Sequence, residues 1–173
     1  MRELLSDEKY SFISRDEKDF VVAFDKAITK IGYENSGIQP YVCFGKYKIE
    51  YWKSGLKSKK IVARFYFRDS DIILRLYFTN IDKYREYIEN SPDFIKNPFI
   101  NNRGKCKQCD KSGGGIGKKG KCSFKKSYTI DNILYEKCAG ENYYFDSSKI
   151  SNIPKYIELL TVFYPEKKLR NAN

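Results

Sequence analysis

The sequence contains no histidine among its 173 residues. Histidine is the commonest general base at neutral pH, the usual partner of serine and cysteine nucleophiles, and a frequent ligand of catalytic zinc. Its absence therefore removes the Ser–His and Cys–His classes of enzyme. A P-loop and a dinucleotide fingerprint are also missing, because the glycine-rich stretch 113–119 has neither the required spacing nor a preceding strand. These absences predict a protein that is not an enzyme.

Long apolar runs are missing as well. No window approaches the roughly eighteen uninterrupted apolar residues of a membrane-spanning helix, and the segment 1–10 has no apolar run long enough for a signal peptide. No internal repeat is visible, which argues against a solenoid. We therefore expect a cytoplasmic protein without membrane contact, in which reducing conditions disfavour disulfides.

What the sequence does contain is enough apolar material for one core. Hydrophobic residues make up 41% of the chain and aromatic residues 16%, so a chain of this length can bury a full hydrophobic core. We predict a single α+β domain over residues 1–173. Its expected form is an antiparallel sheet covered by helices, with a small metal module inserted at about residues 103–140.

The metal module rests on four of the five cysteines. Cys106 and Cys109 form a Cys-x2-Cys pair, and Cys122 and Cys138 follow after twelve and fifteen residues. Two sulfurs at the first spacing can reach one ion from a single tight turn, and four thiolates close a tetrahedral zinc site. The glycine-rich tether 112–117 gives the chain freedom to bend back. We predict a structural Zn²⁺ site with these four ligands.

Other readings of the cysteines remain open. A redox Cys-x-x-Cys usually opens a helix, whereas Cys109 is followed by a stretch with three consecutive glycines. An iron or iron–sulfur centre would use the same four ligands, so the spacing alone does not choose between iron and zinc. We expect Cys43 to lie in an apolar strand and to pack as a small hydrophobic residue.

The net charge of +11 is unevenly placed. Residues 103–126 carry nine lysines and arginines against Asp110 alone, which gives a local charge of +8. Four thiolates around Zn²⁺ sum to −2, so neighbouring lysines stabilise that anion, and the excess suggests an anionic partner such as nucleic acid. The alternative interpretation is that lysine merely solvates the surface.

Periodicity predicts the elements before this module. Ser14 and Glu17 form a capping box for a helix with Phe20, Phe24 and Ile28 on one face, ending at Gly32. Residues 32–40 read as a loop. From residue 41 to 78 the period is two, which is typical of strands. In the second hairpin we predict four apolar pairs on the core face: Phe67–Ile72, Phe65–Leu74, Ala63–Leu76 and Ile61–Phe78.

The other face of this hairpin is polar and aromatic. The predicted register places Arg64 directly opposite Arg75, where like charges repel, and puts Tyr66 and Tyr77 beside them. Such a platform could stack bases and neutralise phosphates. In the alternative, another segment covers the tyrosine rings while both arginines extend to water.

The remaining elements are less strongly signalled. Asn80 is a candidate cap for a helix that ends near Pro92, and a short helical turn at 92–96 is expected to stop before Pro98. A hairpin about Asp131-Asn132 joins strands 124–130 and 133–138. A strand at 143–146 and a helix from Ser151 to Pro165 complete the chain.

Two resemblances follow from these elements. The order of elements resembles small bacterial α+β domains of the frataxin-like, iron-chaperone-like kind. About the last 70 residues resemble a group of uncharacterised bacterial proteins with a four-cysteine C-terminal region, a likeness that implies no known activity. It is carried by the four cysteines, Tyr128-Thr-Ile130, Cys138-Ala-Gly140, Tyr143-Tyr-Phe145 and Ile153-Pro-Lys-Tyr-Ile-Glu-Leu-Leu160.

The sequence thus leaves two functional hypotheses. The first is a non-enzymatic, zinc-stabilised binding or regulatory module that engages nucleic acid through a basic surface. The second is a zinc-stabilised domain that binds a protein partner, or a small apolar ligand between sheet and helices. For the first hypothesis the candidate nucleic-acid-binding residues are Arg64, Tyr66, Arg68, Arg75, Tyr77, Lys118, Lys119 and Lys121.

Overall fold

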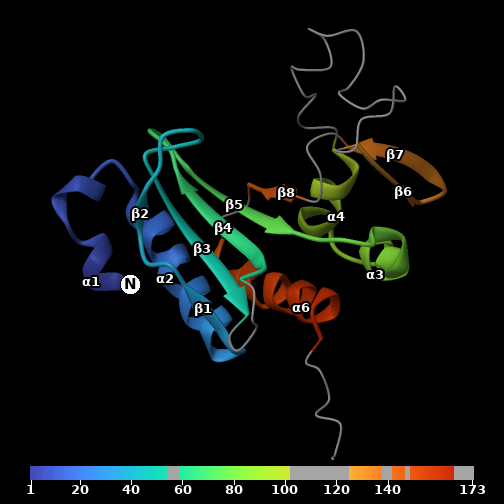
Figure 1. The fold of residues 1–173 in the computed structure, drawn as a ribbon, viewed down its shortest axis with the longest axis horizontal. Coiled ribbons are helices and arrows are strands. Elements are labelled where there is room, and N and C mark those ends of the chain that lie inside the picture. Colours follow the sequence, from blue (N-terminus) through green and yellow to red (C-terminus); the bar gives the residue numbers. More distant parts are fainter. Residues whose placement is uncertain (54–58, 102–124, 138–141, 147–148, 166–173) are drawn as a thin grey trace, which may run out of the picture.

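The protein is an α+β structure with helices against one face of an antiparallel sheet (Figure 1). The computed structural model describes residues 1–53, 59–101, 125–137, 142–146 and 149–165. The sheet order is β1-β3-β4-β5-β8, and β2 pairs with β3. Its strands are β1 (Tyr33–Asn35), β2 (Gln39–Pro40), β3 (Tyr47–Lys53), β4 (Ile61–Phe67), β5 (Ile72–Tyr77) and β8 (Asn142–Phe145).

The helices are short apart from two. The long ones are α2 (Arg15–Lys30) and α6 (Ile153–Phe163). The others are α1 (Arg2–Leu5), α3 (Arg85–Glu89) and α4 (Asp93–Ile100), with 3₁₀ turns at Glu8–Tyr10, Ile81–Tyr84 and Ile150–Asn152. Within the described ranges, every helix is too short or too polar to span a bilayer.

The register of the central hairpin is confirmed. Phe67 pairs with Ile72, Phe65 with Leu74 and Ala63 with Leu76, and all six residues are buried. Since a slip of one residue would turn this apolar set toward solvent, the core fixes the register. The fourth predicted pair lies beyond the strand, because β5 ends at Tyr77.

Helix α2 begins as predicted and is tied to the sheet at its first turn. The Glu17 N–H donates to Ser14 Oγ over 3.3 Å, and the Ser14 N–H donates to Glu17 Oε2 over 3.2 Å, which makes the capping box. The other carboxylate oxygen of Glu17 accepts the Ile72 N–H over 2.9 Å. One side chain therefore caps the helix and fixes it to the start of β5.

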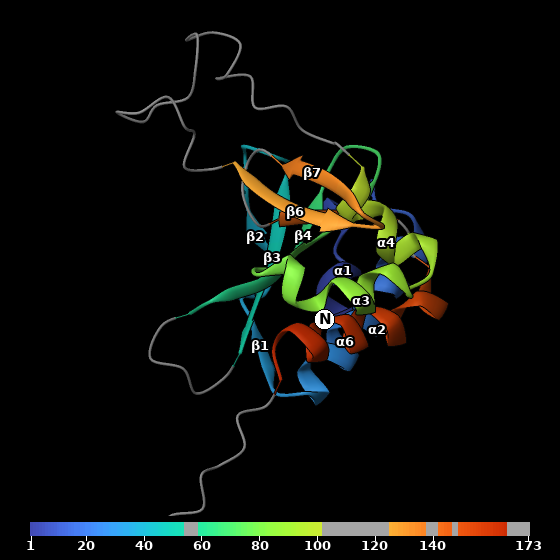
Figure 2. The same ribbon diagram turned by 90° about the vertical axis from the view of Figure 1, so that its right-hand side faces the viewer.

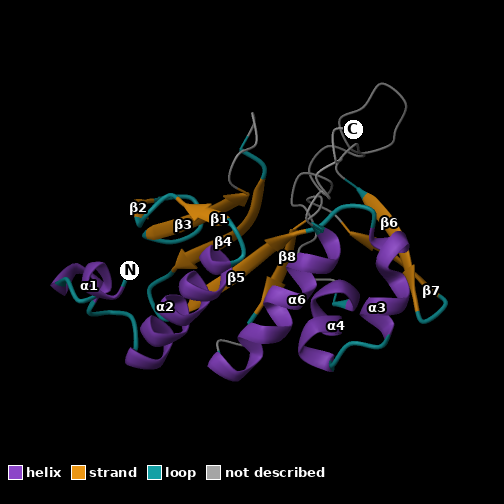
Figure 3. Ribbon diagram, turned by 90° about the horizontal axis from the view of Figure 1, so that it is seen from below, coloured by secondary structure: helices purple, strands orange, loops and turns teal. Residues whose placement is uncertain are grey.

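Aromatic rings fill the layer between the sheet and the helices. Phe20 and Phe24 of α2 pack against Phe65 with centroid distances of 5.8 and 5.1 Å. Tyr156 of α6 packs against Phe145 at 5.4 Å. Figure 3 shows the helices along one side of the sheet, and none of the described helices lies over the opposite face. We call that opposite side the open face.

The predicted strand from residue 41 is wrong for residues 41–46, because β3 begins only at Tyr47. They form a loop before β3, in which the Lys46 N–H donates to the Phe67 carbonyl over 2.7 Å. A Cβ at Gly45 would lie 2.5 Å from that same oxygen, so only glycine allows this approach. Cys43 is consequently exposed rather than packed in a strand. The predicted loop at 32–40 instead contains the short strands β1 and β2.

Two helix boundaries also differ from expectation. Pro98 lies inside α4, which continues to Ile100, although proline removes one helical N–H. The helix persists because Ile95 and Phe99 are buried and hold it against the core. Asn80 makes no side-chain cap; its backbone has φ 56°, and a 3₁₀ turn follows.

The second sheet is the predicted hairpin of β6 (Lys126–Ile130) and β7 (Ile133–Lys137). Asp131 and Asn132 have φ of 50° and 62°, as a two-residue type I′ turn requires. The hairpin lies beside α3 and α4 (Figure 2). The Thr129 N–H donates to Asp82 over 2.8 Å, and the Asp131 N–H donates to Glu89 over 2.7 Å. Two acidic side chains thus attach the hairpin to the helical region.

Candidate functional site

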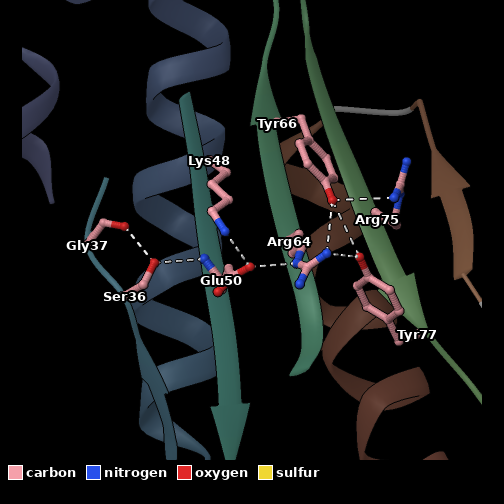
Figure 4. Close-up of polar contacts among 8 residues, drawn as sticks. All are labelled: Ser36, Gly37, Lys48, Glu50, Arg64, Tyr66, Arg75 and Tyr77. Carbon is pink, nitrogen blue, oxygen red and sulfur yellow. Dashed lines mark hydrogen bonds and ion pairs between the residues drawn. The ribbon is translucent and has the colours of Figure 1, made fainter. Parts of the chain in front are cut away.

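The open face carries a cluster of arginines and tyrosines. Arg64 on β4 lies opposite Arg75 on β5, as the sequence predicts. Figure 4 shows their side chains on the same side of the sheet. We define the arginine–tyrosine cluster as Arg64, Tyr66, Arg75, Tyr77 and Tyr144, together with Lys48 and Glu50 of β3.

Tyrosine oxygens separate the two arginines. Arg64 Nη1 donates to Tyr77 Oη over 3.0 Å and to Tyr66 Oη over 3.3 Å. Arg75 Nη1 donates to Tyr66 Oη from the other side, also over 3.3 Å. Both guanidinium groups therefore share one phenol oxygen as an acceptor, which explains how like charges occupy opposite positions.

Glu50 supplies the negative charge of the cluster. Its Oε1 lies 2.9 Å from Arg64 Nε and 2.8 Å from Lys48 Nζ (Figure 4). Burial disfavours the charge on Arg64, but its contacts with Tyr66, Tyr77 and Glu50 raise its pKa above the ordinary value on balance. Burial, and then hydrogen bonding to Tyr66, raises the pKa of Tyr77. At neutral pH the arginine is charged and the Tyr77 hydroxyl keeps its proton.

Arg75 is enclosed by aromatic rings. Its guanidinium carbon lies 4.3 Å from the ring centroid of Tyr144, 4.7 Å from that of Tyr66 and 4.8 Å from that of Phe44. It also donates a hydrogen bond to the Tyr144 hydroxyl. Its buried Nε has no hydrogen-bond partner, and no carboxylate of the described residues pairs with this side chain. Cation–π contacts hold the charge without neutralising it.

The loop 41–46 covers part of the open face. Tyr41 and Phe44 pack on Tyr66 with centroid distances of 5.5 and 5.1 Å. Tyr66 is consequently only 1% exposed, so its ring is not accessible for stacking on a base in this conformation. The arginines are held by phenols and rings instead of extending to water.

The cluster nevertheless has an excess of positive charge. Lys48, Arg64 and Arg75 are three cations, and Glu50 is the one carboxylate that contacts any of them in the described residues, which leaves two positive charges. Arg68 does not add to this excess, because both of its hydrogen-bonding arms reach the carboxylate of Asp71. Arg68 thus stabilises the β4–β5 turn.

The other predicted site residues lie outside the described ranges. These are Cys106, Cys109, Cys122, Cys138, Lys118, Lys119 and Lys121. Among the residues that the structure does describe, no group of three or more metal-ligating side chains comes together. The zinc site stays a prediction from the cysteine spacing.

Three residues in or near the arginine–tyrosine cluster were not predicted from the sequence. Glu50 could have been found from the alternation of Lys48, Ile49 and Glu50 along β3. Tyr144 could not, because its strand pairs with β5 from a distant part of the chain. Lys137 also gave no signal: it is buried, and burial followed by the field of Arg75 lowers the pKa of its ammonium to about 8.

Comparison with known protein families, curated proteins and solved structures finds no match. The resemblances to frataxin-like domains and to four-cysteine bacterial proteins therefore stay predictions.

Proposed function

We propose that this protein is a non-enzymatic, zinc-stabilised binding module that engages nucleic acid through its basic surface. The observation that carries the proposal is the excess of two positive charges in the arginine–tyrosine cluster, on the face of the sheet that no described helix covers. Arginine and phenol groups are common donors of hydrogen bonds to the phosphate oxygens of nucleic acids. The burial of Tyr66 favours phosphate contacts over base stacking, so the expected binding is independent of sequence.

The segment 103–126 supports the same partner. Its charge of +8 exceeds by about six the −2 of a zinc ion held by four thiolates. A reducing compartment such as the cytoplasm would keep those thiols available for metal. The zinc would serve as a structural ion, since four thiolates leave no open coordination position for chemistry.

A second candidate is a zinc-stabilised domain that binds a protein partner. The exposed apolar side chains Ile133 and Leu134, 56% and 65% exposed on β7, favour this reading. A small apolar ligand between sheet and helices fits less well, because it would have to displace the rings of Phe20, Phe24 and Phe65.

A salt titration separates these candidates. Fluorescence anisotropy with labelled single-stranded and duplex oligonucleotides should give an association constant whose logarithm falls linearly with the logarithm of the salt concentration. Replacing Lys118, Lys119 and Lys121 by glutamine should weaken binding to all sequences alike and make the slope shallower by up to about three. If the protein instead binds a protein partner, it should show no salt-sensitive binding to the oligonucleotides.

The matched control removes three lysine charges from helix α2. Lys18, Lys26 and Lys30 lie on α2, and their replacement by glutamine should leave the slope nearly unchanged. If the wild-type protein shows no salt-sensitive binding to DNA or RNA at micromolar concentration, the proposal is wrong and the lysines are solvating charge.

A further inference from the structure

A cavity of about 230 Å³ lies beside the arginine–tyrosine cluster, between α4, β7 and β8. Phe94 and Pro98 of α4 form the apolar part of its wall. Lys137 of β7 and Tyr144 of β8 bring polar groups to it. The volume is below that of pockets for drug-sized ligands, so any ligand here is small.

Lys137 is the most unusual residue of this wall. It is 7% exposed, whereas buried lysines normally pair with a carboxylate. Its Nζ lies 3.4 Å from the Pro98 carbonyl and 4.0 Å from the ring centroid of Tyr143. Throughout the described ranges, no carboxylate lies within ion-pair distance of it. An ammonium has three N–H donors, and these two contacts leave one unused.

Other hydrogen-bond donors line the same cavity. Asn97 and Asn101 contribute side-chain amides, neither of which makes a side-chain hydrogen bond within the described part of the chain. Tyr144 accepts a hydrogen bond from Arg75, so its own hydroxyl proton remains to be donated. A ligand with several acceptor oxygens would satisfy these groups together.

One carboxylate, that of Asp146, also belongs to the wall. It makes no ion pair with Lys137. Its negative charge contributes to raising the pKa of Arg68. Asp146 therefore does not neutralise the lysine. Among the described residues of the wall, the polar groups beside Lys137 and Asp146 are the amides of Asn97 and Asn101 and the hydroxyl of Tyr144, each of which can donate a hydrogen bond.

From this arrangement we propose that the cavity binds a small anion, a carboxylate or a phosphate group, with Lys137 as the charged contact and Asn97, Asn101 and Tyr144 as neutral donors. Both anions have several oxygens that can accept hydrogen bonds from these donors, and both are small enough for the cavity. The inference goes beyond nucleic-acid binding and stands without it, because the open face and this cavity use different charged groups.

Calorimetric titration of the full-length protein with sodium phosphate and, separately, with sodium acetate tests the proposal. Ionic strength is held constant with sodium chloride, because a basic protein attracts anions without a site. We expect saturable binding of at least one probe and a matching rise in Tm with its concentration. Binding of phosphate alone, or of acetate alone, identifies which group the site takes.

Two variants locate the binding. Lys137→Met keeps the length of the side chain without its charge and should raise Kd about tenfold or more. Asn97→Ala should raise Kd a few fold. Because Asn97 is exposed, this variant tests the site even if Lys137→Met does not fold. Lys26→Met on α2 removes the same charge elsewhere and should bind like wild type. No saturable binding of either probe up to tens of millimolar, or equal binding by Lys137→Met and wild type, overturns the proposal.

Discussion

Replacing Glu50 by glutamine should lower stability and strengthen nucleic-acid binding at the same time. Glu50 is 16% exposed and holds both Lys48 and Arg64, whose side chains are 20% and 27% exposed. Glutamine keeps the shape but leaves both cations without their carboxylate. Because these groups are largely but not fully buried, the expected cost is about 1–3 kcal/mol.

That cost can be measured in two ways. For a domain of this size each kcal/mol shifts Tm by about 2–4 °C, so Tm should fall by about 2–12 °C. Urea denaturation should show a lower midpoint with an unchanged m-value, since the surface exposed on unfolding is the same. Asp69→Asn is the control, because it breaks a mostly exposed ion pair with Lys46 and should change Tm very little.

The binding effect has the opposite sign. The substitution raises the excess charge of the cluster by one, so affinity for oligonucleotides at low salt should increase. A double-mutant cycle of Glu50→Gln with Arg64→Met should show that the two losses of stability do not add. A Tm within about 1 °C of wild type, or simple additivity, would refute the account of Glu50 as the neutralising group.

Three further outcomes are expected. Metal analysis should find about one zinc per chain, and its removal should loosen residues 103–140 in hydrogen exchange while the apolar sheet core survives. Ser14→Ala should cost about 0.5–2 kcal/mol in urea denaturation, and Glu17→Ala more, since Glu17 also accepts an N–H from the sheet. Gly45→Ala should displace the loop 41–46 and lower Tm. Gly37→Asn should be tolerated, because asparagine accepts a φ of 67° and an added Cβ would meet nothing within 4 Å.

Local patterns predicted those parts of the fold that one apolar face determines. The β4–β5 register follows from alternating large apolar residues, and it also placed Arg64 opposite Arg75. The capping box at Ser14 and the Asp131-Asn132 turn were confirmed because each depends on neighbours only a few residues away.

The predictions failed where the alternation of residue types along the sequence did not correspond to alternating burial. The alternating pattern of a strand is present at Tyr41, Cys43 and Gly45. The segment is nevertheless a loop, in which the Lys46 N–H donates to the Phe67 carbonyl and Cys43 is exposed. The strands β1 and β2 are short and polar, so their pairing with β3 gives no apolar pattern. At the site, sequence placed the arginines together but could not show that Tyr144 would stack on Arg75 from 69 positions away.

The long separation between β5 and β8 has a consequence for synthesis. Helix α2 and strands β1 to β5 leave the ribosome before β8 and α6 and can already pair with close neighbours. Until then β5 is an edge strand with a free row of backbone groups, the kind of edge that recruits other chains. Arg75, which later lies among the rings, is a charged gatekeeper on that temporary edge. We expect chains truncated before β8 to precipitate in cell-free translation without chaperones, and full-length chains to remain in solution.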